Sequence, residues 1–376
     1  MKNLNQKGKE SAKKGVNNKM NGNINHPGRY LSEVLERLDM SQKELAVRTG
    51  VTEKHISTVI NGSKGISAGF AKKLEYALGI DALNWMEWQA EYEKQSLDFE
   101  EKYGITQDEL DILKRLKDII VYLEKRGFIN RCNNDDERVL EVRKAMGVAN
   151  LQSIPEITYS AAYRAQVKKN AKVDPYVLYA WQRLCEKETA EISVKEHLDI
   201  AKLQESIPAI KALMFKDINE ISDELTELLA DCGVAFKIVH HFTGAPVQGF
   251  IRNPEGKERI ILCMTLRGKR ADRFWFTLFH EIGHILHGDA GVRFVDFQSV
   301  KNAMEDAADL FAQETLINTE QYRAFLVMRD YSLPAIRRFA KMQGVQPFII
   351  IGRLQSDEII EWSTYSDQIE TYEWIA

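Results

Sequence analysis

Residues 279–287 of the chain read FHEIGHILH. His280 and His284 are four residues apart, so in an α-helix their imidazoles lie on one face, one turn from each other. At that spacing both rings can reach a single Zn²⁺ at about 2.0–2.1 Å. Glu281 lies beside the same face, where a carboxylate can accept a proton from an attacking water. The pattern therefore predicts a zinc site with Glu281 as its general base.

The surrounding sequence indicates that this helix is buried. Residues 274–279 read FWFTLF, and Ile282, Ile285 and Leu286 continue the apolar pattern. Gly288 is a typical helix end. Histidine and glutamate side chains are costly to bury unless they are paired or bound to a metal. The alternative is a chance match among the eight histidines of the chain, and the apolar context argues against it.

A catalytic zinc needs a third protein ligand, and the sequence that follows offers one. Residues 301–312 read KNAMEDAADLFA, a predicted helix in which Glu305 and Asp309 share a face. The small alanines of this stretch would allow it to approach the histidine helix closely. We expect Glu305 to bind zinc and Asp309 to accept the second N–H of a ligand histidine. The alternative is that these acidic residues only form a solvated face.

His287 is a competing ligand, because it lies on the same helical face as His280. At 1.5 Å of rise per residue the two histidines are about 10.5 Å apart along the axis. That is too far for one small ion unless the helix breaks. We therefore expect His287 to cap the helix, to support the ligands or to contact a substrate.

Composition limits the classes of protein that fit. The chain has 376 residues, 44% of them hydrophobic and 28% charged, as expected for two or three globular domains. No run approaches the roughly 18 apolar residues of a membrane span, and the N-terminus has no signal-peptide core. We expect a cytoplasmic protein with no membrane partner. The four cysteines form no Cys-x-x-Cys pair, which argues against a cysteine zinc site.

The predicted fold is multi-domain and mainly α-helical. Residues 1–25 form a disordered basic arm, residues 26–95 an all-α helix-turn-helix domain, and residues 96–232 a helical linker or scaffold. Residues 233–376 form an α+β, zincin-like domain with a small β-sheet. In the linker, a capping box at residues 106–109 predicts one long helix that ends at Gly127, and Pro208 is expected to begin a short helix.

Three short β-branched runs, residues 234–239, 247–252 and 259–264, predict strands, and the last two form a hairpin. A hairpin sheet next to the metal helix suits a peptidase, because an edge strand can hold an extended peptide by backbone hydrogen bonds.

The N-terminal helices predict a DNA-binding motif. Ser41 opens one helix with a capping box, Gly50 forms a tight turn, and Thr52 caps a second helix that ends at Asn61. In such a motif the second helix enters the major groove, and two half-sites require a homodimer. The residues expected to contact base edges or phosphates of operator DNA are Lys43, Arg48, Thr52, Glu53, Lys54, His55, Ser57, Thr58 and Lys64.

Both ends of the chain resemble known families. Residues 26–93, with HPG at 26–28, SQKELA at 41–46, ING at 60–62 and NWM at 84–86, resemble the Xre-type helix-turn-helix of HigA antitoxins. Residues 234–355, with HEIGH at 280–284 and EDAADLFA at 305–312, resemble the ImmA/IrrE metallopeptidases. The second resemblance implies that His280, His284 and Glu305 hold zinc, that Glu281 is the base, and that helix-turn-helix repressors are cut. The two motifs cover about half of the chain.

Three functions remain open from the sequence. The leading hypothesis is a DNA-binding regulator of the HigA type that carries a zinc metallopeptidase with a His-Glu-x-x-His motif and a glutamate ligand. Its substrate would be a repressor, an antitoxin or its own linker after residue 93. The second is a non-catalytic antitoxin or repressor whose zinc domain is a sensor or a scaffold for a cognate toxin. The third is a peptidase with a vestigial helix-turn-helix.

Overall fold

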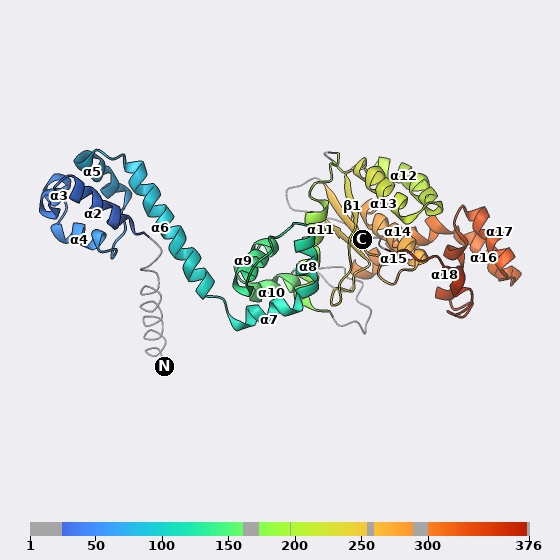
Figure 1. The fold of residues 1–376 in the computed structure, drawn as a ribbon. Helices are drawn as coiled ribbons and strands as arrows, with labels where there is room; N and C mark the ends of the chain where they lie inside the picture. Colours follow the sequence, from blue (N-terminus) through green and yellow to red (C-terminus); the bar gives the residue numbers. More distant parts are fainter. Residues whose placement is uncertain (1–24, 161–172, 196, 254–258, 289–299, 374–376) are drawn as a thin grey trace. The chain divides into compact units, whose positions relative to one another are not determined.

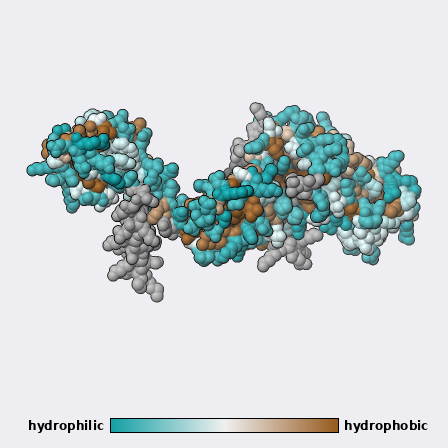
Figure 2. All heavy atoms as spheres, viewed as in Figure 1, coloured by the Kyte–Doolittle hydropathy of each residue, from teal (hydrophilic) through white to brown (hydrophobic). Residues whose placement is uncertain are grey.

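A computed structural model describes residues 25–160, 173–195, 197–253, 259–288 and 300–373 of the protein. The chain divides into two compact units, Met1–Thr106 and Gln107–Ala376 (Figure 1). Of the arm predicted at residues 1–25, all but Asn25 lies outside the described residues. Hydrophilic side chains cover most of the visible face of both units, and hydrophobic ones show in small patches (Figure 2).

The first unit is all α-helical, as predicted. Ser41 accepts a hydrogen bond from the Glu44 backbone N–H, and Thr52 accepts one from the His55 N–H, so both predicted caps are present. Gly50 lies between the two capped helices at φ 64°, a left-handed conformation that favours glycine. The helices are α2 (Pro27–Arg37), α3 (Gln42–Thr49), α4 (Glu53–Ile60), α5 (Ala68–Leu78) and α6 (Ala82–Tyr103).

One hydrophobic core holds this unit together. Each helix contributes a fully buried side chain to it, namely Leu31, Leu45, Ile56, Leu74 and Trp85. Gln89 of α6 accepts a hydrogen bond from the Ile66 backbone N–H at 2.7 Å, which ties the start of α6 to the loop before α5. The helix then continues to Tyr103, beyond the residue-95 end predicted for the domain.

The helices that follow differ from the predicted ones at two points. The single helix expected from the capping box to Gly127 is two helices, which meet at Leu116 (φ −87°, ψ 2°). Leu116 is buried, and the bend at this position lets apolar residues of both helices pack into the core. The helices are α7 (Gln107–Arg115), α8 (Lys117–Lys125), α9 (Asp135–Met146), α10 (Ile154–Ser160), α11 (Pro175–Thr189), α12 (Ile200–Ala212) and α13 (Ile218–Ala230), with short 3₁₀ turns at Leu151–Ser153 and Leu213–Phe215.

Pro208 does not begin a helix, contrary to the prediction. It lies inside α12, which starts after the N-cap Asp199. Pro208 is exposed, so water can bond the carbonyl that loses its backbone donor, which makes an internal proline tolerable there.

A buried ion pair connects α7 with α9. The guanidinium of Arg143 donates two hydrogen bonds to the Glu109 carboxylate, at 2.9 and 2.6 Å. The Leu151 backbone N–H donates a third, at 3.1 Å. The Glu109 side chain is fully buried, and these donors offset the cost of placing its charge away from water.

The sheet has three strands among the described residues: β1 (Val234–Ile238), β2 (Gly249–Arg252) and β3 (Ile260–Met264). Their order is β1-β3-β2, with β1 parallel and β2 antiparallel to the central β3. The three predicted strands and the antiparallel pairing of the last two are confirmed. β2 is therefore an edge strand of the described sheet.

Five more helices complete this unit: α14 (Ala271–Leu286), α15 (Val300–Leu316), α16 (Thr319–Met328), α17 (Leu333–Gln343) and α18 (Pro347–Ser356), and a 3₁₀ turn follows at Ser366–Gln368. α14 contacts β2, β3 and α18, and it packs most extensively against α15. A Cβ atom on Gly283 would lie only 3.2 Å from the Ala308 Cα atom, so the two helices meet closely. Ala308 and Ala312 are fully buried there. Of the described helices, none is long and apolar enough to cross a membrane.

Candidate functional site

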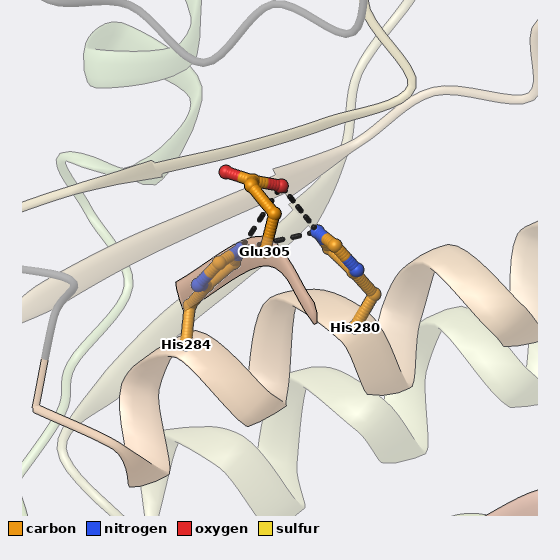
Figure 3. A group of neighbouring side chains, drawn as sticks. All are labelled: His280, His284 and Glu305. Carbon is orange, nitrogen blue, oxygen red and sulfur yellow. Dashed lines mark hydrogen bonds and ion pairs between the residues drawn. The ribbon is translucent and has the colours of Figure 1, made fainter. Parts of the chain in front are cut away.

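The close contact of α14 with α15 brings three side chains with metal-ligand chemistry together (Figure 3). The Nε2 atoms of His280 and His284 are 3.0 Å apart. Glu305 Oε2 lies 3.3 Å from Nε2 of His280 and 3.7 Å from Nε2 of His284. Tetrahedral bonds of about 2.0–2.1 Å place ligand atoms roughly 3.3 Å from one another. The donor set and its spacing therefore fit one zinc ion without movement of the backbone.

The three side chains differ in their exposure to solvent. The side chains of His280 and His284 are 4% and 1% exposed, whereas that of Glu305 is 30% exposed. Glu305 is therefore the member of the group that solvent reaches most easily. A group of three protein ligands is typical of catalytic zinc sites, whereas structural sites use four.

Asp309 holds the other nitrogen of the His280 ring. Its Oδ1 atom lies 2.7 Å from Nδ1 of His280, one helical turn along α15 from Glu305. A carboxylate in this place orients the ring and keeps its proton on Nδ1, so that Nε2 faces the other two side chains. The structure thus places Asp309 in the position predicted from its spacing.

The acidic neighbours change the protonation of His280. Burial lowers its pKa, but hydrogen bonds to Asp309 and Glu305 and the charge of Glu281 outweigh burial and raise the pKa to about 9. Without a metal, His280 is therefore an imidazolium at neutral pH, held by acidic side chains. A divalent cation would replace that positive charge.

Glu281 is 5% exposed and lies against the first residue of β2. A Cβ atom on Gly249 would be 2.7 Å from Glu281 Cγ and closer still to Oε1. Only a residue without a side chain leaves room for this carboxylate beside the sheet edge. Gly249 was not predicted from the sequence, although a glycine in a β-branched strand often marks a close approach of this kind.

His287 lies outside the group of three. It is the C-cap residue of α14, is exposed, and has its ring centroid 6.2 Å from that of Phe311. Its backbone N–H donates to the Gly283 carbonyl at 3.0 Å. Its position thus agrees with the expected cap rather than with a ligand.

The residues predicted to contact DNA divide into two sets. Five of them are exposed. Lys43 lies in the first turn of α3 and Arg48 in its last turn, and Thr52, Glu53 and Lys54 lie at the start of α4. Lys64 is also exposed, and its Nζ atom is 3.2 Å from Nδ1 of His55. Ser57 and Thr58 are half-buried, and the Thr58 hydroxyl donates to the His55 carbonyl at 2.8 Å.

His55 is the least available of these side chains. Its ring packs edge-on against Phe70, with 4.8 Å between ring centroids. Burial, and then the charges of Lys64 and Lys73, lower its pKa, so the ring is neutral at pH 7. The exposed ends of α3 and α4 are therefore better placed to meet nucleic acid than His55 is.

Comparison with protein families agrees with both sites. Residues 31–83 match the helix-turn-helix family model, and residues 253–354 match that of a peptidase family described as the IrrE N-terminal-like domain. The chain thus carries a helix-turn-helix of the Xre type followed by a domain of the IrrE/ImmA peptidase family, and the peptidase match includes the three clustered side chains.

The individual relatives each match a small part of the chain. Virulence-associated protein A' of Dichelobacter nodosus is 38% identical over 69 residues, which are 18% of this chain and 60% of that protein. Two solved structures each cover 22% of this chain. A HigA-family addiction module antidote protein from Coxiella burnetii is 28% identical, with 96% of its chain covered and a TM-score of 0.20. A putative antidote protein of a plasmid maintenance system from Nostoc punctiforme is 26% identical, with 98% covered and a TM-score of 0.19.

Proposed function

We propose that this chain is a DNA-binding regulator whose C-terminal domain is a zinc-dependent peptidase. The observation that carries the proposal is the placement of Glu281. Its side chain is buried, its charge acts on His280, and its carboxylate lies so close to Gly249 that a side chain there would displace it. A purely structural metal site needs no such carboxylate, because structural sites use all four coordination positions for ligands.

We assign each side chain of the group a task. His280, His284 and Glu305 hold the ion, and Asp309 orients the His280 ring. A bound Zn²⁺ would polarise the scissile carbonyl and lower the pKa of the attacking water. Glu281 accepts the proton of that water and delivers it to the leaving amine. His287, at the end of α14, is available to contact the substrate.

The edge strand β2 is the proposed platform for the substrate. One side of β2 pairs with β3, and no other described strand pairs with its second side. An extended peptide can add to such an edge through backbone hydrogen bonds. Because Gly249 is both the first residue of β2 and the neighbour of Glu281, a peptide on this edge would pass directly beside the general base.

The substrate we propose is a repressor or antitoxin in a separate chain. The other candidate bond, after residue 93 of this chain, lies within α6, which continues to Tyr103. A helical segment would have to unwind before it could bind as an extended strand, at the cost of its backbone hydrogen bonds. A flexible segment of another protein has no such cost.

The helix-turn-helix would bind operator DNA as a homodimer in the cytoplasm. In this proposal the base edges are contacted by Thr52 and by four residues of α4, namely Glu53, Lys54, Ser57 and Thr58. The phosphates are contacted by the exposed side chains of Lys43, Arg48 and Lys64. A cognate toxin is the alternative protein partner. If the peptidase domain has no turnover, it would be a sensor or a scaffold for that toxin.

Glu281→Gln tests the proposed catalysis. Zinc-loaded wild-type protein is incubated with a library of peptides, and new termini are identified by mass spectrometry. We expect cleavage by the wild type, and a loss of about 10²–10⁴-fold in the variant, with metal content and operator binding unchanged. Cleavage at the wild-type rate in the variant would contradict the role of Glu281. No cleavage by metal-loaded wild type would favour the sensor or scaffold.

A further inference from the structure

A hollow beside the first turns of α14 has no role in the mechanism above. It encloses about 260 Å³, including space open to solvent. Three parts of the chain line it. They are the residue before β2 (Gln248), the loop after β3 (Arg267 and Lys269) and the first turns of α14 (Arg273 and Thr277). Much of this space is open to solvent, so the hollow is a depression in the surface rather than an enclosed pocket.

Positive charge gathers around this hollow. Four cationic side chains line it, and two of them have carboxylate partners: Lys269 pairs with Glu373 at 2.5 Å, and Arg270 with Asp272 at 2.8 Å. The other two, Arg267 and Arg273, form no ion pair with any described residue. The lining thus has an excess of positive charge that a bound anion would neutralise.

An aromatic side chain holds two of the cations in place. The guanidinium carbons of Arg270 and Arg273 lie 5.3 and 5.6 Å from the centroid of the Trp362 ring. Stacking on one ring restricts both guanidinium groups. Arg270 is also the N-cap residue of α14, and no side chain caps the helix. The positive end of the helix dipole adds to the attraction for an anion.

Thr277 is the second, independent feature that indicates a ligand. It is only 4% exposed and lines the hollow. Its hydroxyl forms no hydrogen bond with a described residue. The oxygen is not among the fully buried polar atoms, so it can be reached from the hollow. An acceptor atom in the hollow would supply the missing bond.

The hollow lies in line with the general base. Arg273, Thr277 and Glu281 are spaced four residues apart, so they share one face of α14. Thr277 is about 6 Å and Arg273 about 12 Å from Glu281 along the helix axis. An extended peptide advances about 3.3 Å per residue. The hollow is therefore two to four residues away from a bond that Glu281 would attack.

We propose that this hollow, here termed the anion subsite, binds a carboxylate or phosphate group of the peptide substrate two to four residues from the scissile bond. The inference rests on the proposed peptidase and adds its specificity. Arg267 and Arg273 bind the negative charge, and Thr277 donates a hydrogen bond to it. Either an Asp or Glu side chain or a phosphorylated serine supplies the required chemistry.

Peptide binding tests the subsite without turnover. Zinc-loaded Glu281→Gln protein is titrated with fluorescent hexapeptide pools that hold Glu, phosphoserine, Gln or Lys at one position. We expect the Glu or the phosphoserine pool to bind about tenfold more tightly than the Gln pool, and the stronger of the two identifies the anion. Added Arg267→Gln or Arg273→Gln should reduce the preference to less than twofold, with binding of the Gln pool unchanged. Arg323→Gln on α16 is the matched control and should keep the preference.

Thr277→Val tests the subsite with a substitution that is not expected to destabilise the fold. Because the hydroxyl has no partner, its replacement by a methyl group should leave the melting temperature equal or higher, while binding of the anionic pool falls about threefold. Equal binding of the Glu, phosphoserine and Gln pools, or a preference that survives in the Arg267→Gln/Arg273→Gln double variant, would overturn the subsite. If the wild type cleaves peptides without preferring anionic ones, the proposed subsite is refuted and the proposed peptidase activity is retained. If the anionic peptides bind more tightly but the wild type cleaves nothing, the subsite stands and the proposed peptidase activity fails.

Discussion

His280 and Asp309 are joined through Nδ1 and Oδ1 at 2.7 Å, which turns the other ring nitrogen toward His284 and Glu305. This contact couples the geometry of the ligand group to a residue that does not itself touch the ion. Removal of such a carboxylate typically weakens metal binding by about 10–100-fold. We therefore predict that Asp309→Ala lowers zinc affinity by that factor, measured by competition with a chelator. Asp306→Asn, on an exposed face of α15, should bind zinc as the wild type does.

Zinc binding should release a proton at neutral pH. The pKa of His280 is about 9 without a metal, and a ligand nitrogen must be free of its proton. Zinc affinity should therefore rise about tenfold per pH unit from pH 7 toward 9 and then level off. Calorimetry in two buffers of different ionisation enthalpy measures the released proton. An affinity that is constant over this range would contradict the assignment.

The same pKa predicts how the stability of the metal-free protein depends on pH. The folded value of about 9 exceeds the ordinary 6.5 of histidine. The folded state therefore binds the proton more tightly than the unfolded state does, and His280 stabilises the fold below pH 6.5. This stabilisation is lost as the pH rises from 6.5 to about 9. Thermal unfolding of metal-free protein should show the loss, and His280→Gln should remove that part of the pH dependence.

Gly249→Ala should separate catalysis from metal binding. The added Cβ would overlap the Glu281 carboxylate, so the general base must move while His280, His284 and Glu305 keep their places. We expect peptide cleavage to fall at least tenfold, because a misplaced base loses much of its effect, with zinc content unchanged. Gly69→Ala in α5, where a Cβ meets no atom within 4 Å, is the control and should leave both properties intact.

The clustering of His280, His284 and Glu305 was predictable from the sequence because it depends mainly on helix periodicity. His280 and His284 share a face at any four-residue spacing, and so do Glu305 and Asp309. The caps at Ser41 and Thr52 were predictable for a similar reason, since the side chain and the N–H that it accepts are close in sequence. Each of these features is local to one helix or to two helices in close contact.

The features that sequence reasoning missed depend on contacts between distant elements. Gly249 meets Glu281 only because β2 lies at the edge of a sheet whose central strand is β3. The bend at Leu116 and the internal position of Pro208 follow from packing and exposure, which overrode the local signals. The pairing of Glu109 with Arg143 joins residues 34 positions apart, and no periodicity predicts it.

That ion pair should be important for the stability of the second unit. Glu109→Ala would leave the buried Arg143 guanidinium without its carboxylate and the Leu151 N–H without an acceptor. Removal of one partner of a buried pair costs about 3–5 kcal/mol. Urea unfolding should show a loss of that size. Asp111→Ala, which breaks an exposed ion pair with Lys114 on the same helix, should change stability by less than about 1 kcal/mol.

The metal content of purified full-length protein tests the central claim most directly. Elemental analysis of the wild type should give one zinc per chain, and His280→Ala and Glu305→Ala should each lose it while Asp306→Asn retains it. Well-folded wild-type protein that holds no metal after zinc is added, or a Glu305→Ala variant that still holds a full equivalent, would contradict the zinc site on which the proposed peptidase depends.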